Sequence, residues 1–452
     1  MSTLSPDVAR ELVAALRRGT VPQTGLDKVA TGLERLLEAL REHLDAVAKG
    51  RGEVKFLRGE YGAGKTFVSR LICLLARQEG FATTEVVISV NDTPLHQFQT
   101  IYRRLVERLA TLDAPQGAFK AVVDAWIYEV GEEVTRIRGL AEGDPAFDDA
   151  VEARLEEKLA EISAINPSFA QVLRGYHRAT SAGDFATSNG LLGWLGGQPQ
   201  VGRSVKADAG IKGDVDGPAA LAFLRGLLLL LRQSGYRGLV LVLDEVETIQ
   251  RMHGGVREKS LNALRQLVDM LDGGELPGLF LVVTGTREFY EGYKGLKGLT
   301  PLHQRIETRF GDDPHFDNLK APQVRLLPFN RDRLVEVARK VRGVYPASAP
   351  QRIAGKVDDA FLDALVGTFA QRFGGVEITP RCFLRTLVDV LDRVDQHADY
   401  DPRADKGLKI ENLKIEEAEL NPEELDAVER TRKGDGAKDE ADEPPPRRRL
   451  EG

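Results

Sequence analysis

Apolar residues recur at helical spacing from the start of the chain. Leu36, Leu40 and Leu44 fall on one face of a predicted helix, and Gly50 is a suitable residue to end it. A helix with one apolar face packs that face against another part of the protein. We therefore expect residues 1–50 to form an N-terminal helical arm.

Five short apolar runs, separated by helical patterns, predict buried strands. They are residues 54–57, 84–90, 238–243, 279–283 and 324–327. The third and fourth runs are apolar almost throughout, without alternation, which is typical of parallel strands covered by helices on both faces. The pattern predicts an α/β core over residues 51–330, built on a five-stranded parallel sheet.

Residues 111–220 interrupt this order between the second and the third predicted strand. Acidic helical stretches, such as residues 152–165, precede a glycine-rich and weakly periodic region around Trp194 and Gly213. We interpret the segment as a mainly helical insertion into the core. Its glycine-rich part is long enough to include a mobile loop.

Helical periodicity returns after Asn330, which is a natural N-cap residue. Three amphipathic helices are predicted over residues 334–341, 361–373 and 382–394. They predict a small helical lid domain over residues 331–400. Residues 401–452 are polar, charged and rich in proline, a composition typical of a disordered tail.

Composition narrows the possible functions. The 452 residues are 42% hydrophobic and 29% charged, which excludes a wholly disordered or fibrous chain. The formal net charge of −7 gives no overall positive field that would draw the surface to DNA or to anionic lipid. We therefore expect contact with nucleic acid to be local or made through partner proteins.

The cysteines and histidines do not follow the spacing of disulfide or metal-binding motifs. Cys73 and Cys382 are the two cysteines, and both fall within helical patterns far apart in sequence, so we expect neither a disulfide framework nor a zinc site. The seven histidines include no pair at metal-ligand spacing. Neither a signal peptide nor a long apolar segment is evident. We expect a cytoplasmic protein without membrane contact.

The motif G-x-x-x-x-G-K-[ST] follows the first predicted strand and precedes a predicted helix. Its residues are Gly59, Glu60, Tyr61, Gly62, Ala63, Gly64, Lys65 and Thr66. Glycines let backbone N–H groups turn toward phosphate, and the helix N-terminus adds its dipole. Lys65 would reach the β- and γ-phosphates, and the Thr66 hydroxyl would bind Mg²⁺. The motif predicts a P-loop (Walker A) that binds ATP and Mg²⁺; the weaker alternative is a glycine-rich turn with an incidental lysine.

Carboxylates end the third predicted strand. Asp244 would lie at the carboxyl edge of the sheet and position Mg²⁺, as in a Walker B strand, and Glu245 would orient or deprotonate the attacking water. A helix cap is the alternative reading. Thr284, at the end of the next strand, would point its hydroxyl at the γ-phosphate, although a plain strand-to-loop turn fits nearly as well. Glu247 is interpreted as facing solvent.

Together, the P-loop, the Asp-Glu strand, the polar-ended strand and the three-helix segment resemble an AAA+ ATPase, nearest the origin-recognition and initiator branch, over about residues 50–395. More narrowly, the sequences GEYGAGKTFVSRL, VVISVNDTPLHQFQTIYRRL and GYRGLVLVLDEVETIQ, with the region around Trp194, resemble the BrxD-like ATP-binding proteins of bacterial BREX phage-defence systems. The resemblance implies a cytoplasmic ATPase that acts with other defence proteins, such as an Lhr-like helicase.

The same resemblance implies roles for arginines. Arg309 matches the arginine finger that reaches the nucleotide of a neighbouring subunit, with Arg305, one helical turn earlier, as the reserve candidate. A surface arginine paired with Glu307 or with nearby acids is the alternative. Arg381 resembles the second sensor arginine of the lid, and Arg385 could substitute for it.

These readings combine into one expectation: an oligomeric ATPase that works as a motor or loader for DNA-directed defence machinery. After the predicted lid, about 55 residues remain, too few and too polar for a winged-helix DNA-binding domain. A second hypothesis is an ATP-gated switch or scaffold that hydrolyses slowly and recruits a partner protein. A small-molecule kinase is disfavoured by the Asp-Glu pair and the lid.

Overall fold

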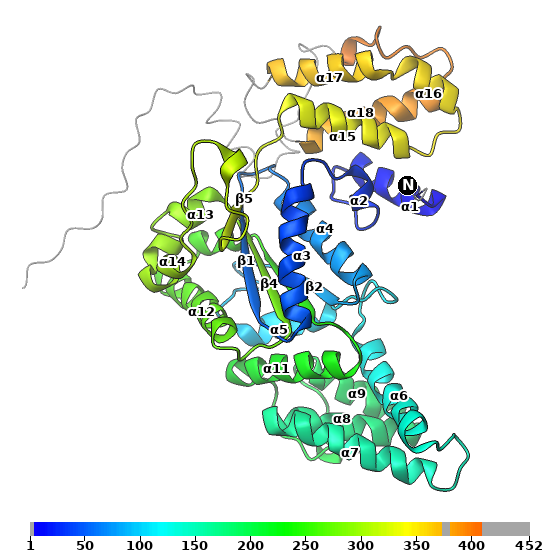
Figure 1. Ribbon diagram of the computed structural model, residues 1–452, viewed down its shortest axis with the longest axis vertical. Coiled ribbons are helices and arrows are strands. Elements are labelled where there is room, and N and C mark those ends of the chain that lie inside the picture. Colours follow the sequence, from blue (N-terminus) through cyan, green and yellow to red (C-terminus); the bar gives the residue numbers. More distant parts are fainter. Residues whose placement is uncertain (1–3, 373–379, 409–452) are drawn as a thin grey trace, which may run out of the picture.

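The computed structural model of the protein describes residues 4–372 and 380–408. Three parts follow one another along its longest axis (Figure 1). The C-terminal helices lie at one end, the sheet with its covering helices lies in the middle, and the helices inserted between the second and third strands lie at the other end. Of the predicted tail, residues 409–452 lie outside the described residues.

The sheet has the five predicted strands, all parallel. They are β1 (Glu53–Arg58), β2 (Ala82–Val87), β3 (Leu239–Asp244), β4 (Leu279–Gly285) and β5 (Gln323–Arg325). The strand order is β2-β3-β4-β1-β5, so β4 lies between β1 and β3. Leu57 of β1 is in register with Thr284, and Leu243 of β3 with Val283. The carboxyl ends of β1, β3 and β4 therefore meet at one edge of the sheet, and the predicted α/β core is confirmed.

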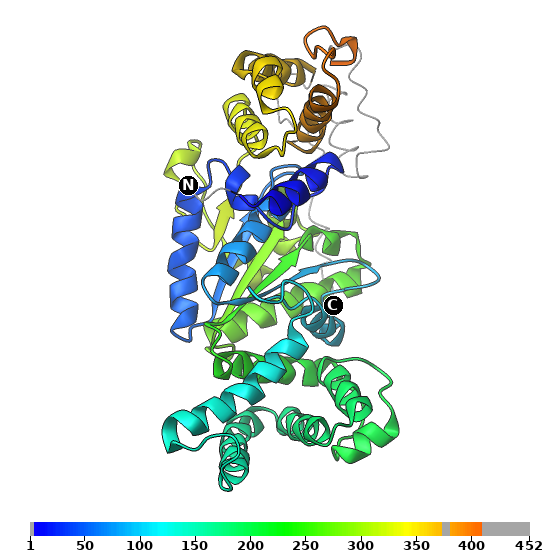
Figure 2. The same cartoon turned by 90° about the vertical axis from the view of Figure 1, so that its right-hand side faces the viewer.

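Helices cover both faces of this sheet, which explains why β3 and β4 are apolar over almost their whole length. One face packs against α3 (Glu34–Ala48) and α4 (Lys65–Gln78), and the other against α5 (Phe98–Glu107), α11 (Gly217–Gln233) and α12 (Gly254–Asp272). Figure 2 shows α3, in blue, along one side of the sheet. In β4, Phe280 and Val282 pack in the first layer, whereas Leu281 and Val283 pack in the second. Short helices α13 (Arg287–Glu291) and α14 (Thr300–Ile306) follow β4.

The insertion is helical, as predicted. It contains α6 (Phe119–Arg138), α7 (Phe147–Ile165), α8 (Pro167–Ser181), α9 (Phe185–Leu195) and α10 (Arg203–Asp208). Its glycine-rich part forms packed helices rather than the mobile loop that the sequence suggested. The reason is close packing: a Cβ on Gly190 would lie 2.9 Å from Val205 Cγ1. Trp194 is buried, and its indole N–H donates to the Gly213 carbonyl at 3.0 Å.

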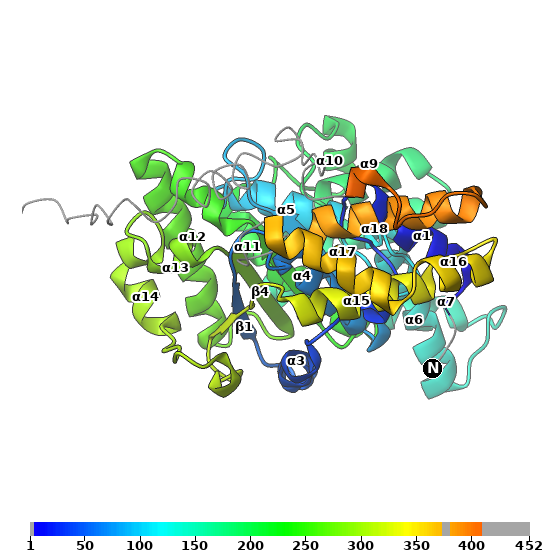
Figure 3. The same cartoon turned by 90° about the horizontal axis from the view of Figure 1, so that it is seen from above.

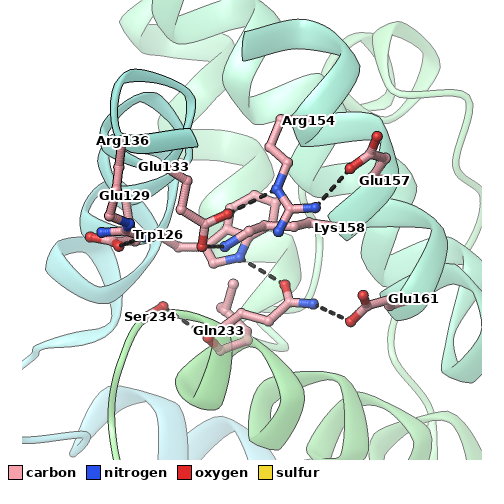
Figure 4. Close-up of polar contacts among 11 residues, drawn as sticks. Trp126, Glu129, Glu133, Arg136, Arg154, Glu157, Lys158, Glu161, Gln233 and Ser234 are labelled. Carbon is pink, nitrogen blue, oxygen red and sulfur yellow. Dashed lines mark hydrogen bonds and ion pairs between the residues drawn. The ribbon is translucent and has the colours of Figure 1, made fainter. Parts of the chain in front are cut away.

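A polar network joins the insertion to the helix that leads into β3 (Figure 4). The indole N–H of Trp126, on α6, donates to Gln233 Oε1 at the end of α11, at 2.9 Å. Gln233 Nε2 in turn donates to Glu161 Oε2 on α7, also at 2.9 Å. One amide thus links three helices, because Gln233 supplies a donor and an acceptor at once.

The C-terminal part is a bundle of α15 (Arg331–Val344), α16 (Pro350–Lys356), α17 (Asp359–Arg372) and α18 (Pro380–Gln396). Asn330 caps α15 as predicted, accepting from the Arg333 N–H at 3.0 Å. The short α16 was not predicted, because seven residues carry little periodicity.

The N-terminal residues contact two parts of the molecule. Helix α1 (Pro6–Arg17) lies beside α18 (Figure 3), where Arg17 forms an ion pair with Asp392 at 2.6 Å, while α2 (Leu26–Val29) packs between α4 and α15. Short 3-10 turns complete the fold: η1 (Val246–Arg251), η2 (Leu296–Gly298), η3 (Pro314–Phe316) and η4 (Lys406–Leu408). Among the described helices, none combines the length and the apolar character needed to cross a membrane.

Candidate active site

The glycine-rich loop lies between β1 and α4, and α4 begins at Lys65. Gly62 and Gly64 have φ values of +79° and +88°, which side-chain-bearing residues rarely adopt. A Cβ on Gly59 would lie 3.1 Å from Ala63 Cβ, so the loop is tightly wound. These conformations turn the loop around the N-terminus of a 14-residue helix, the geometry that binds phosphate.

Lys65 is buried at the start of this helix. Its ammonium donates to the carbonyls of Gly59 and Glu60 at 3.0 and 3.3 Å, and it lies 4.9 Å from the centre of the Tyr61 ring. Burial raises the pKa of the Tyr61 hydroxyl, helped by the nearby charge of Glu247. The loop thus holds one fixed positive charge at its centre.

Asp244 is buried at the end of β3, where two hydroxyls reach its carboxylate. Thr66 donates to Oδ2 at 3.0 Å, and Thr284, at the end of β4, donates to Oδ1. Thr66 and Asp244 thus present a hydroxyl and a carboxylate oxygen side by side. Mg²⁺ binds through one or two such protein oxygens together with phosphate and water, so these two residues fit the predicted ion. Among the described residues, including those of this site, no group of three or more His, Cys, Asp or Glu side chains is placed to hold a metal ion.

The sequence predicted that Thr284 points its hydroxyl at the γ-phosphate. In the structure Thr284 is fully buried, and its hydroxyl donates to Asp244 while accepting the backbone N–H of Glu245 at 3.3 Å. A buried hydroxyl needs a partner, and the neighbouring strand end supplies two. This placement supports a role in fixing the Asp-Glu turn, and contact with phosphate stays a prediction.

Glu245 lies at the mouth of the site with a left-handed backbone, φ +59°. Among the described non-glycine residues, only Gln200 shares a positive φ with Glu245. A residue with a side chain is strained in this conformation, and such strain is found often at functional sites. Part of the Glu245 side chain reaches solvent. Partial burial removes water from its carboxylate and raises its pKa, and the negative charge of Asp244 raises the pKa further. A carboxylate with a raised pKa is a better proton acceptor.

Glu247 was interpreted as facing solvent, and that reading is wrong. Only 4% of its side chain is exposed, because the 3-10 turn η1 after β3 rotates it inward. Its Oε1 lies 3.7 Å from Lys65 Nζ, whereas Oε2 has no hydrogen-bond partner among the described residues. Burial raises the pKa of Glu247, and the charge of Lys65 opposes that rise.

A cavity of about 600 Å³ extends from the P-loop between the core and the C-terminal bundle. Its walls come from the P-loop, from Asp244 and Glu245, from N-terminal residues 16–36 and from the bundle. The apolar wall residues include Leu16, Val21, Pro22, Val29, Phe329, Val337, Val341 and Leu384. One end therefore suits phosphates, and the apolar walls suit an aromatic base.

The predicted arginines separate into two groups. Arg381 lines the cavity from the start of α18, and Arg385 lines a smaller neighbouring recess. Arg305 and Arg309 lie outside this cavity. Helix α14 ends at Ile306, so Arg309 does not share a helical face with Arg305 as predicted.

The surroundings of Arg305 and Arg309 also differ. Arg305 forms an ion pair with Asp269 of α12, which agrees with the alternative reading of a surface arginine paired with a nearby acid. Arg309 is exposed and pairs with no carboxylate among the described residues. The backbone on either side of it is held, since Gln323 donates to the Ile306 carbonyl and Arg325 to the Gly311 carbonyl, both at 2.8 Å.

Comparison with known families agrees with this site. A model of the BREX system ATP-binding proteins BrxC/D matches residues 4–409. The chain belongs to that family. The match covers the core, the insertion and the C-terminal bundle, so all three parts belong to this family of ATP-binding proteins. No curated protein matches the chain.

Three features of the site were not predicted from the sequence: the inward Glu247, the wall formed by residues 16–36, and Arg333 on α15, which also lines the cavity. Arg333 belongs to a run, Arg331 to Arg333, that mixes both signs of charge and is read as surface decoration. Helical phase offered a signal, because Arg333 precedes Val337 by four residues.

Proposed function

We propose that this BREX-family protein is a cytoplasmic ATPase that hydrolyses ATP to ADP and phosphate and works as a motor or loader in phage defence. The observation that carries the proposal is the convergence of Lys65, Thr66, Asp244 and Glu245 at one end of a single cavity. A P-loop lysine, a hydroxyl and carboxylate pair, and a strained carboxylate at the mouth are the parts that phosphoryl transfer to water requires.

Each residue has a defined task. Loop N–H groups and Lys65 bind the phosphates, and Thr66 and Asp244 hold Mg²⁺, which would neutralise charge that develops on the phosphate oxygens. Thr284 holds the Asp244 carboxylate and the Glu245 backbone in place. Glu245 accepts a proton from the attacking water, and its raised pKa favours this step.

The hydrolytic role is tested with Glu245→Gln, which keeps size and hydrogen bonding but loses the base. ATP binding should persist while turnover falls about 10²-fold or more. If the variant turns over ATP at the wild-type rate, with and without DNA and partners, Glu245 is not the base. The slow ATP-gated switch or scaffold then becomes the better function.

We further propose that the active form is a homo-oligomer in which Arg309 completes a neighbour's site. This role is supported by the hydrogen-bonded backbone on either side of Arg309, by its side chain, which pairs with no carboxylate among the described residues, and by its position outside its own cavity. DNA would be contacted mainly through partners, such as an Lhr-like helicase or other defence proteins. Arg381, which lines the cavity, would sense the phosphates as the lid closes, as in the origin-recognition branch.

Mixing two inactive variants tests the shared site. Arg309→Ala keeps an intact P-loop and Lys65→Ala keeps an intact finger, so mixed oligomers should recover part of the ATPase activity. Arginine fingers contribute about 10³ to 10⁵ in rate, so a few restored interfaces are measurable. Subunit exchange is first shown by a tagged pull-down. A mixture that exchanges but stays inactive rules out Arg309, and Arg305→Ala is then tested in its place.

A further inference from the structure

The basic side chains of α15 differ in one respect. Four of them are paired with carboxylates: Arg331 with Asp363, Arg339 and Arg342 with Asp359, and Lys340 with Glu336. The fifth, Arg333, has no hydrogen bond from its guanidinium and no ion pair with any residue that the structure describes. It is also the one basic residue of α15 that lines the nucleotide cavity.

Arg333 occupies a definite place along the cavity. Just before α15, the Phe329 ring lies beside Gly64 of the P-loop, 3.7 Å from where a Cβ would be. Farther along the same face of α15, Val337 and Val341 line the apolar wall. Arg333 therefore lies between the phosphate end of the cavity and the end that suits a base.

The N-terminal segment leaves room for this side chain. Gly32 has φ +65°, and a Cβ there would lie 3.1 Å from Arg333 Nε and 3.4 Å from its central carbon. Lys340, two turns farther along α15, donates to the Ala30 carbonyl and to the Thr31 hydroxyl, at 2.5 and 3.3 Å. The segment is thus tied to α15 while Gly32 adjoins the guanidinium without a side chain.

We propose that Arg333 binds the α-phosphate of the nucleotide from the lid side. A planar guanidinium presents paired donors that match phosphate oxygens, and a polyanion would supply the partner that this arginine lacks among the described residues. Because α15 belongs to the C-terminal bundle and the P-loop to the core, the contact would join the two parts through the ligand. This inference rests on the proposed nucleotide binding.

The test measures the affinities of ATP, ADP, AMP and adenosine for the full chain, by competition against a fluorescent ATP analogue. Arg333→Ala should weaken ATP, ADP and AMP about tenfold each and leave adenosine unchanged, because adenosine lacks the phosphate. Arg333→Lys should recover part of the loss. Arg331→Ala, on the same helix but paired with Asp363, is the matched control and should change none of the four.

Other outcomes of this titration would contradict the proposed phosphate contact. Equal losses for AMP and adenosine would place Arg333 on the base or ribose and reject the phosphate contact. Unchanged affinities in Arg333→Ala would reject any nucleotide contact. If Arg333→Ala melts well below the wild type, Arg333→Gln supplies the same comparison. If the wild type binds none of the four ligands, the proposed function itself is wrong, and this inference is wrong with it.

Discussion

Two buried lysine–glutamate pairs, one in the insertion and one beside the P-loop, differ in how many of their polar atoms are hydrogen-bonded. In the insertion, Lys158 Nζ lies 2.6 Å from Glu133 Oε1. In the cavity beside the P-loop, Lys65 Nζ lies 3.7 Å from Glu247 Oε1. All four side chains are largely buried, with 4% to 14% exposed. Different exposure to solvent therefore does not explain why the two pairs differ in distance.

The insertion pair is complete. Arg154 Nε donates to the second oxygen of Glu133 at 2.8 Å, so both oxygens of that carboxylate accept hydrogen bonds (Figure 4). Burial alone would raise the pKa of Glu133, but the hydrogen bonds from Lys158 and Arg154 lower it overall. A carboxylate with this many donors fixes α6 against α7, a structural function.

The cavity pair is incomplete. Glu247 keeps one oxygen without a partner in the described structure, and burial raises its pKa. Lys65 is shared between Glu247 and the loop carbonyls, and bound phosphates would compete with Glu247 for the same ammonium. A buried ion pair that serves stability alone is expected to have all of its polar atoms hydrogen-bonded. Missing hydrogen bonds in a buried pair, as at Glu247, therefore indicate a functional site.

The largest expected effect comes from removing the cavity lysine. Lys65→Ala should weaken ATP binding at least about a hundredfold, because a charge-assisted phosphate contact is lost. Its melting temperature should stay close to that of the wild type, since the long pair with Glu247 adds little stability. A fluorescent-nucleotide titration with a parallel thermal melt measures both, and unchanged affinity would contradict the assigned site.

The matching change in the insertion should have the opposite profile. Lys158→Met leaves Glu133 with one donor in a buried place and should lower the free energy of unfolding by about 2–3 kcal/mol. ATP affinity of the folded protein should not change. Urea denaturation gives the value, and Lys120→Met, which breaks an exposed pair with Asp124, should change stability by about 1 kcal/mol or less. If Lys158→Met and Lys120→Met lower the free energy of unfolding equally, the Lys158–Glu133 pair has no special structural role.

The pH dependence of stability should have opposite signs at the two carboxylates. The lowered pKa of Glu133 stabilises the fold above about pH 4.5, the ordinary glutamate value, and this stability is lost as pH falls through the folded-state pKa. The raised pKa of Glu247 means that the folded state binds its proton first, so stability relative to Glu247→Gln rises as pH falls toward 4.5. Urea unfolding of the wild type, Glu133→Gln and Glu247→Gln between about pH 3 and 7.5 measures both slopes, and slopes of the same sign would refute the contrast.

The smallest effect concerns the link between insertion and core. Trp126→Phe removes the indole donor to Gln233 and keeps most of the apolar volume, so unfolding should become easier by about 1 kcal/mol. Nucleotide affinity should be unaffected. If affinity falls as well, the insertion is coupled to the site, and the division between the two regions is less sharp than their ion pairs indicate.

The sequence by itself determined the features that depend on neighbours along the chain. The central strands could be predicted because burial on both faces makes β3 and β4 apolar almost throughout. The P-loop could be predicted because its glycines, lysine and threonine act within eight consecutive residues. Asp244 and Glu245 followed from the same logic, since a strand end needs no distant residue to define it. These signals are local, so the fold class and the phosphate end of the site could be derived from pattern alone.

Only the tertiary structure decided which side chains meet across the chain. Glu247 turns inward because a 3-10 turn changes its direction, and Thr284 is drawn to Asp244 because β3 and β4 are neighbours in the sheet. Arg333 reaches the cavity because α15 packs over residues 30–32, about 300 positions earlier in the chain. Such contacts depend on the directions and the packing of whole elements, which hydrophobic periodicity does not encode.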